Sequence, residues 1–93
     1  MLDLLKQTLR ITWTNDDAYL EEIISRGENT LNDLVGVELD YSNPSPAQTL
    51  LLNYCRYDYN NALEYFEENF HKEILRLQLT EGVRLYMVEG DPT

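Results

Sequence analysis

The side chains best suited to chemistry in this sequence are three pairs of adjacent acids. They are Asp16–Asp17, Glu21–Glu22 and Glu67–Glu68. Paired carboxylates can bind a cation or share a proton, but a metal site also needs ligands that converge from other elements. The sequence contains no DxDxDG loop and no second histidine. We therefore expect these acids to form solvated helical faces and predict no metal site.

The single histidine, His71, and the single cysteine, Cys55, are the other reactive side chains. A nucleophilic site needs a nucleophile, a base and a third group that orients the base, and the sequence offers no such set around His71. Cys55 falls on an apolar helical stripe, where a thiol usually serves as inert packing. Phosphate-binding loops and nucleophile-elbow motifs do not occur. The sequence therefore predicts no catalytic residues, no cofactor and no enzymatic activity.

The charge of the chain restricts its partners. Its 93 residues carry a net charge of −10, and residues 14–45 hold eight acids against a single base. Binding to phosphates requires patches of lysine and arginine, so we expect no specific binding of nucleic acid. No apolar run approaches the roughly 20 residues that cross a bilayer, and the N-terminus lacks the apolar core of a signal peptide. We expect a protein made in the cytoplasm, without a membrane partner.

The spacing of apolar residues predicts an all-α fold, a small bundle of about four helices with an extended C-terminal tail. A first helix is expected over residues 2–10, followed by an extended connector over 11–13. Thr14 is a good N-cap for a second helix, and Gly36 suits the left-handed conformation that ends helices. Between them, apolar residues recur at three- and four-residue steps, as in an amphipathic helix.

A long apolar stripe begins after a loop over residues 37–45. Ser45 and Pro46 are a favourable N-cap and first residue for a helix. We expect a helix over 46–69, a bend near Asn69 and a further helix over 70–81 that ends at Gly82; one uninterrupted helix is the alternative. Residues 83–88 have the composition of a strand. We therefore divide the chain into a helical domain, residues 1–82, and a tail or arm, residues 83–93.

Tyrosines are concentrated in the part of the chain that follows Pro46. Tyrosine is favoured at protein–protein interfaces because its ring is apolar and its hydroxyl can remain hydrated. The alternative is that these rings edge a small core with their hydroxyls in water. We predict an interface with a neighbouring subunit or partner that uses side chains of this region and of the tail, namely Tyr54, Tyr57, Tyr65, Val83, Leu85, Tyr86 and Met87.

The order of these features resembles the phage head–tail connector family, also described as head-completion or DNA-packaging proteins. The resemblance lies in Leu9-Arg10-Ile11, a polar turn, the Asp16–Asp17 pair and the apolar series Leu20, Ile24 and Leu31. It resumes in the helix from Pro46 to Phe66. It implies an adaptor that forms a ring of about a dozen subunits beneath the portal protein and receives a stopper or tail-completion protein. Its location would be the head–tail junction of the virion, after assembly in the host cytoplasm.

The acids of the second helix gain a physical role under this resemblance. Asp16, Asp17, Glu21 and Glu22 could form an acidic channel or rim surface, so that DNA passes through the ring without specific binding. A rival hypothesis is a small acidic phage protein that mimics DNA or regulates an enzyme. Assembly separates the two, because a mimic stays monomeric or dimeric and binds a basic protein in a salt-sensitive way.

Overall fold

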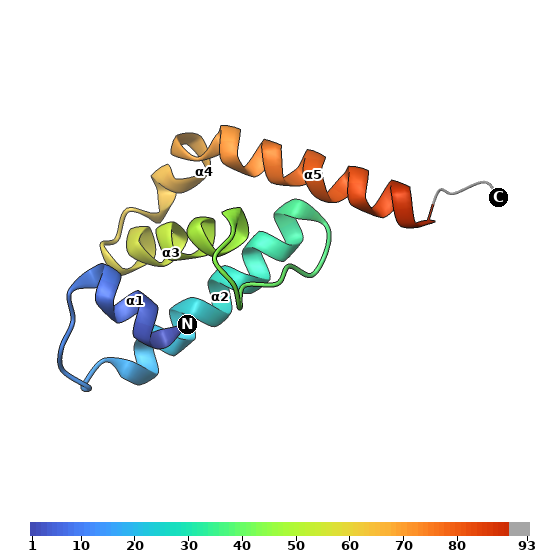
Figure 1. Ribbon diagram of the computed structural model, residues 1–93. Helices are drawn as coiled ribbons and strands as arrows, with labels where there is room; N and C mark the ends of the chain where they lie inside the picture. Colours follow the sequence, from blue (N-terminus) through green and yellow to red (C-terminus); the bar gives the residue numbers. More distant parts are fainter. Residues whose placement is uncertain (90–93) are drawn as a thin grey trace.

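The protein is an all-α bundle, as the apolar spacing predicted (Figure 1). The computed structural model describes the backbone of residues 1–89 and the side chains of residues 1–84. The elements in chain order are α1 (Leu2–Leu9), α2 (Asp17–Val35), α3 (Pro46–Tyr59), the 3-10 turn η1 (Leu63–Tyr65), α4 (Phe66–Asn69) and α5 (His71–Glu89). None of the helices in the described part is both long and apolar enough to cross a membrane.

Helix α3 lies at the centre of the bundle, with α1 and α2 on one side and α5 on the other (Figure 1). The molecule is elongated, with extents of 55 × 25 × 17 Å, because the C-terminal half of α5 continues beyond the body. The core is apolar, and its most deeply buried side chains are Leu5, Leu20, Ile23, Leu31, Leu51, Cys55 and Phe66. Burial of these side chains is the main force that holds the helices together.

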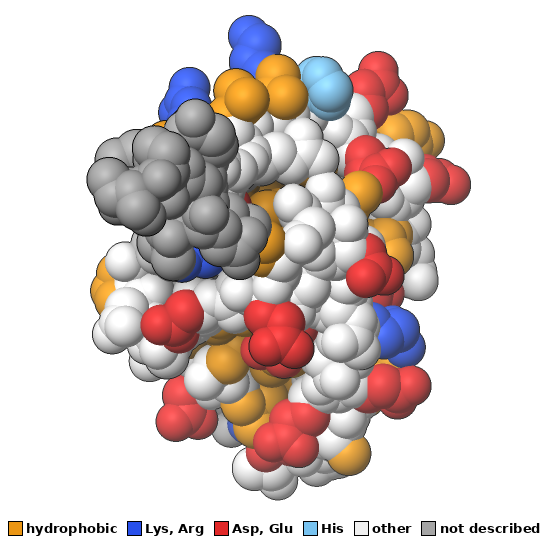
Figure 2. All heavy atoms as spheres, turned by 90° about the vertical axis from the view of Figure 1, so that its right-hand side faces the viewer, with side chains coloured by type: hydrophobic (Ala, Val, Ile, Leu, Met, Phe, Trp, Pro, Cys, Tyr) orange, Lys and Arg blue, Asp and Glu red, His pale blue; other side chains and the backbone are white. Residues whose placement is uncertain are grey.

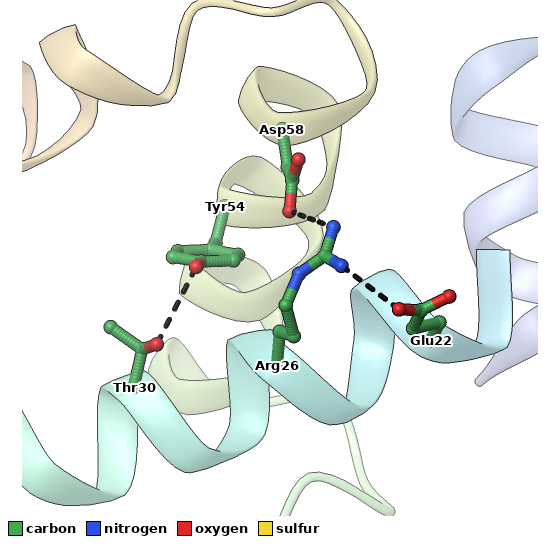
Figure 3. Close-up of polar contacts among 5 residues, drawn as sticks. All are labelled: Glu22, Arg26, Thr30, Tyr54 and Asp58. Atoms are coloured by element: carbon green, nitrogen blue, oxygen red, sulfur yellow. Dashed lines mark hydrogen bonds and ion pairs between the residues drawn. The ribbon is translucent and has the colours of Figure 1, made fainter. Parts of the chain in front are cut away.

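The closest packing is between α2 and α3, where Gly27 permits a close approach. A methyl group on Gly27 would lie 2.7 Å from Cδ1 of Leu51 and 2.9 Å from Cδ1 of Tyr54, so a larger residue would force this core to shift. At the edge of this contact, Arg26 donates to Asp58 on α3 at 3.0 Å and to Glu22 at 3.3 Å (Figure 3). The hydrogen bond to Asp58 and its negative charge raise the pKa of Arg26.

Several helix ends are confirmed because local chemistry determines them. Gly36 ends α2 in the left-handed region, with φ of 90°. The Ser45 hydroxyl accepts a hydrogen bond from the backbone N–H of Gln48 at 3.1 Å, and Pro46 is the first residue of α3. The start of α2 differs from the prediction: its N-cap is Asp16, and the Thr14 carbonyl only accepts from the N–H of Asp17.

Helix α3 is shorter than the predicted helix over residues 46–69. It ends at Tyr59, and Asn61 adopts a left-handed conformation with φ of 57°. The side-chain amide of Asn60 donates to the Arg56 carbonyl at 2.8 Å, which satisfies a carbonyl at the helix end. The chain then folds back so that Phe66 packs edge-on against Tyr54 on α3, with ring centroids 5.2 Å apart. The predicted bend near Asn69 is present, between α4 and α5.

Helix α5 continues through Gly82, where the sequence predicted a helix end, and it includes residues 83–88, where a strand-like segment was expected. An isolated strand would leave its backbone groups without partners, whereas a helix satisfies them within the segment. Arg84 and Glu81 form an ion pair across this stretch. The predicted domain boundary at residue 82 therefore falls inside a helix, and residues 90–93 of the predicted tail lie outside the described residues.

Candidate subunit interface

The outer face of α5 carries the largest exposed aliphatic stripe in the described part of the chain. Leu75, Leu79 and Val83 are 45%, 63% and 62% exposed, respectively. Their four-residue spacing places them on one side of the helix. The opposite side is buried through Ile74 and Leu77, so the helix uses one apolar face for the core and leaves a second one in water. We call Leu75, Leu79 and Val83 the outer stripe.

Two cations accompany the outer stripe. Lys72 and Arg76 lie one turn before Leu75 or Leu79 and are exposed. Lys6, Arg26 and Arg84 pair with acids within the subunit, whereas Arg10 and Arg56 form no ion pair with the described residues. No such ion pair involves Lys72 or Arg76 within the described residues. Figure 2 shows basic and hydrophobic side chains gathered along the upper edge of the molecule, over α5.

The connector and the first turns of α2 present a different surface, rich in aromatics and acids. Trp13 and Tyr19 are 48% and 44% exposed. The Trp13 indole donates to the Asp16 carboxylate at 3.0 Å, and Tyr19 follows one helical turn later. Glu21 and Glu22 are exposed on the same stretch. We call Trp13, Tyr19 and Glu22 the corner surface; Glu21 lies about 160° away from Tyr19 around the helix.

The four acids of the predicted channel surface are therefore not equivalent. Asp16 accepts from Trp13, and Asp17 forms an ion pair with Lys6 of α1, so both are half-buried and have partners within the subunit. Glu22 pairs with Arg26 but remains exposed, and Glu21 is exposed. Of these four acids, only Glu21 and Glu22 are therefore exposed on the surface of the subunit.

Tyr54 must be removed from the predicted interface. It is only 5% exposed, and its hydroxyl lies 3.4 Å from the Thr30 hydroxyl on α2 (Figure 3). Its ring is part of the α2–α3 core because it sits on the inner face of α3, so it cannot contact a second molecule in this conformation. The alternative, a tyrosine packed at the core, fits the ring of Tyr54, but its hydroxyl lies against Thr30 and not in water.

Tyr57 and Tyr65 line one shallow hollow of about 290 Å³ between the end of α3 and η1. Tyr57 is half-buried, packs edge-on against Phe66 and Phe70, and accepts from the Asn69 amide at 3.0 Å. Tyr65 is 54% exposed. These two predicted interface residues therefore lie together on the surface, on a side of the molecule formed by the α3–α4 connection.

The sequence-based prediction missed Leu75 and Leu79 of the outer stripe, and also the exposed rings of Trp13 and Tyr19. The prediction ended the helix at Gly82, which separated Val83 from the preceding residues. Continuing the helix through Gly82 would have revealed the four-residue series 75, 79, 83. Among the predicted tail residues, Val83 belongs to this stripe, and the side chains of Leu85, Tyr86 and Met87 lie outside the described residues.

A groove of about 550 Å³ lies between α3, α5 and the loop that precedes α3. Its lining is mainly apolar and includes Leu39, Leu50, Phe70 and Leu77. Asp40 stands at this loop, where hydrogen bonds from the Ser42 side chain and backbone lower the pKa of the Asp40 carboxyl. Charged residues also line the groove, namely Asp40, Glu73, Arg76 and Glu81.

The reactive side chains occupy no common site. Cys55 is fully buried, and this burial raises the pKa of its thiol to about 12, so the thiol is protonated and shielded at neutral pH. His71 is exposed at the start of α5. In the described part of the chain, no three His, Cys, Asp or Glu side chains are grouped as a metal would require.

Comparison with known proteins identifies one family. Residues 1–87 match the family described as "Phage gp6-like head-tail connector protein". The match includes the corner surface and the outer stripe, and it extends over all the helices except the last two described residues of α5. No curated protein and no solved structure gives a significant match.

Proposed function

The chain belongs to the phage gp6-like head–tail connector family, and from that premise we propose that it assembles as a ring beneath the portal protein. Family membership makes the protein a structural component of the head–tail junction. The proposed ring has about a dozen subunits, extends the DNA channel and receives a stopper or tail-completion protein. The observation that supports assembly is the outer stripe on α5, because small single domains seldom leave an aligned apolar face without a partner.

The charge of the subunit supports passage of DNA without binding. Each chain has a net charge of −10, so a ring of such subunits is strongly negative. Like-charge repulsion opposes contact between the ring and the phosphates of DNA, and acids outnumber bases on the face that Figure 2 shows. In this role the chain acts as an adaptor, without enzymatic activity on DNA.

The C-terminal segment is the proposed contact with the portal or the next protein. Residues 83–93 follow the part of α5 that packs on the body, where Ile74 and Leu77 provide the buried contacts. Deleting residues 83–93 should leave a folded subunit, because these core contacts remain. We expect the truncated protein to fail to join the portal in a sedimentation assay, and normal docking would contradict this assignment.

The mass of the full chain, alone and mixed with purified portal, tests the function directly. We expect a ring-sized species on the portal in native mass spectrometry. A chain that stays monomeric or dimeric, ignores the portal and binds a basic DNA-processing protein with strong salt dependence would instead favour the DNA-mimic hypothesis. The net charge of −10 alone is compatible with either class, so assembly is the deciding property.

A further inference from the structure

The groove between α3 and α5 is an apolar trough that the packing of the subunit leaves open. Its volume of about 550 Å³ lies within the range of about 300–1,000 Å³ that is usual for ligand sites. Leu50 and Leu77 line it and are only 3% and 7% exposed, so they form the floor of a groove and not a patch on a convex surface. Apolar side chains of a partner can therefore enter it without any change in the core.

Two helices form the long walls of this groove. Helix α3 leads into η1 and α4, and α5 then runs back in the opposite direction beside it (Figure 1). The α5 wall extends from Phe70 to Glu81, which is about 16 Å or three helical turns. Thr49 on α3 and Thr80 on α5 line the groove and are exposed. A groove of this length between two helices suits an amphipathic helix, which inserts side chains spaced at three and four residues.

The charged residues of the lining favour a partner that carries basic groups. Asp40 lies in the loop at one end and Glu73 on the α5 wall, and both are exposed. Neither acid forms an ion pair in the described part of the chain. Glu81 pairs with Arg84, and Arg76 is the one cation among the lining residues. The groove thus offers two carboxylates and one guanidinium to a partner.

The same charges disfavour other occupants. A second copy of this chain has a net charge of −10, so its acids would be repelled by Asp40 and Glu73. Phosphates of a nucleic acid or of a lipid head group would be repelled for the same reason. A small apolar molecule would cover the floor but would leave the charges of the rim without partners. A helix with both apolar and basic side chains satisfies the floor and the rim together.

We propose that this groove binds an amphipathic helix of a different protein, with apolar residues on one face and lysine or arginine beside them. The apolar side chains pack on the floor, and the basic ones pair with Asp40 and Glu73. The inference rests on the proposed function, in which the adaptor joins other proteins of the junction, and it specifies the chemistry of one such partner. The site is distinct from the outer stripe, because Thr80 lies about 100° from Leu79 around α5.

Binding of a synthetic helix to the full chain tests this proposal. The probe is a fluorescein-labelled peptide of leucine and lysine, about 14 residues or roughly four turns long, with leucines at three- and four-residue steps. The comparison peptide has glutamate in place of each lysine. We expect fluorescence anisotropy to show saturable binding of the lysine peptide, and binding of the glutamate peptide that is weaker by about tenfold or more.

Matched variants separate the groove from the overall charge. Thr80→Trp fills the groove without a change in charge and should weaken binding by about tenfold or more, whereas Thr8→Trp adds the same ring to an exposed position of α1 and should not. Glu73→Lys should weaken binding by about threefold or more. Glu67→Lys makes the same charge change in the first turn of α4, outside the groove, and should have a smaller effect. Circular dichroism verifies that each variant keeps its helices.

Three results would overturn the inference. The first is a lack of saturable binding, or equal binding of the two peptides. The second is binding that Thr80→Trp leaves intact. The third is an equal loss with Glu73→Lys and Glu67→Lys, because attraction to the net charge would then explain capture of the peptide.

The proposed function is tested separately by the mass of the chain mixed with portal. A chain that fails the peptide tests but forms a ring-sized species on the portal would leave the function standing without this site. A chain that binds the peptide in the groove but forms no such species would overturn the function, and the groove would remain a site for a basic helix. Self-association of the wild type that Thr80→Trp abolishes would assign the groove to a second copy and overturn the inference.

Discussion

Helix α2 packs against α3 over most of the body, whereas the outer stripe of α5 has no packing partner within the described residues. Both surfaces are built from apolar residues at helical spacing. In the α2–α3 contact, residues such as Leu31 and Leu51 are completely buried, while Leu79 is 63% exposed. The comparison teaches that helical periodicity identifies an apolar face but does not say whether its partner belongs to the same chain.

The polar side chains differ between the two regions in the same way. Arg26 at the edge of the α2–α3 contact has two acidic partners, Asp58 and Glu22. Lys72 and Arg76 beside the outer stripe form no ion pair in the part of the chain that the structure describes. The first region is thus complete within one subunit, and the second acquires its partners only through assembly in our proposal.

Replacing a leucine by alanine should affect the free energy of unfolding very differently in the two regions. This is the largest effect that we predict. Leu51→Ala removes a fully buried side chain and leaves a cavity, so we expect a loss of about 2–5 kcal/mol in the free energy of unfolding. Leu79→Ala should change it by less than about 0.5 kcal/mol, because the side chain is exposed in the subunit. Urea unfolding monitored by circular dichroism measures both values.

Leu79→Ala should weaken assembly although it leaves the stability of the subunit almost unchanged. It removes part of the proposed contact between subunits. The concentration at half-assembly is the matching measurement. Equal losses of unfolding free energy in the two variants would show that the outer stripe is packed within the subunit, and the distinction between the regions would disappear.

A larger side chain at Gly27 tests the α2–α3 contact by overfilling it, where Leu51→Ala tests it by leaving a cavity. Gly27→Val places methyl groups against the buried side chains of Leu51 and Tyr54, which must shift to make room, so we expect a destabilisation of about 1–3 kcal/mol. For a domain of this size, each kcal/mol lowers Tm by about 4–8 °C. The control Ser25→Val introduces the same side chain at an exposed position of α2 and should leave Tm nearly unchanged. A normal Tm for Gly27→Val would mean that α2 and α3 separate more easily than their packing indicates.

Local chemistry explains which parts of the packed region could be predicted from the sequence. The Ser45–Pro46 start and the Gly36 end depend on a few neighbouring atoms, so residue types suffice to predict them. The end of α3 was missed because the apolar stripe keeps its phase across Asn61. Asn60 and the left-handed Asn61 end the helix there, and the return of Phe66 onto Tyr54 is a contact between segments that local propensity does not report.

The candidate interface was predictable only in part, for a related reason. Glycine inside a helix costs about 1 kcal/mol relative to alanine, which neighbouring residues can offset, so Gly82 was a misleading sign of a helix end. Placing the end there hid the series that includes Leu75 and Leu79. The burial of Tyr54 depends on how α2 lies against α3, and the sequence contains no local sign of that arrangement.

The ion pair between Arg26 and Asp58 offers a smaller test of the packed region. Arg26 is 46% exposed in its side chain, so solvent screens the pair, and we expect Asp58→Asn to cost about 0.2–1 kcal/mol. A double-mutant cycle with Arg26→Gln isolates the interaction, and in about 1 M salt it should shrink further. Glu22→Gln is the matched control and should have a smaller effect, because Glu22 is 65% exposed. A coupling that is unchanged by salt would place the pair in a drier contact than its exposure indicates.

The smallest effect is expected in the loop that joins α2 to α3, where Ser42 lowers the pKa of Asp40. A carboxyl whose pKa is lower in the folded state stabilises the fold above its ordinary pKa, about 3.9, and this contribution is lost as pH falls through the folded pKa. Ser42→Ala removes the hydroxyl donor but keeps the backbone N–H donor at 2.9 Å, so the pKa of Asp40 should rise only part of the way to its ordinary value. An NMR titration of the Asp40 carboxyl measures this shift, with Ser25→Ala as a control that leaves Asp40 untouched. Because the acid is exposed and belongs to the loop rather than to the core, stability at neutral pH should remain that of the wild type; a marked loss there would show that the loop, and not only the helix faces, holds α2 against α3.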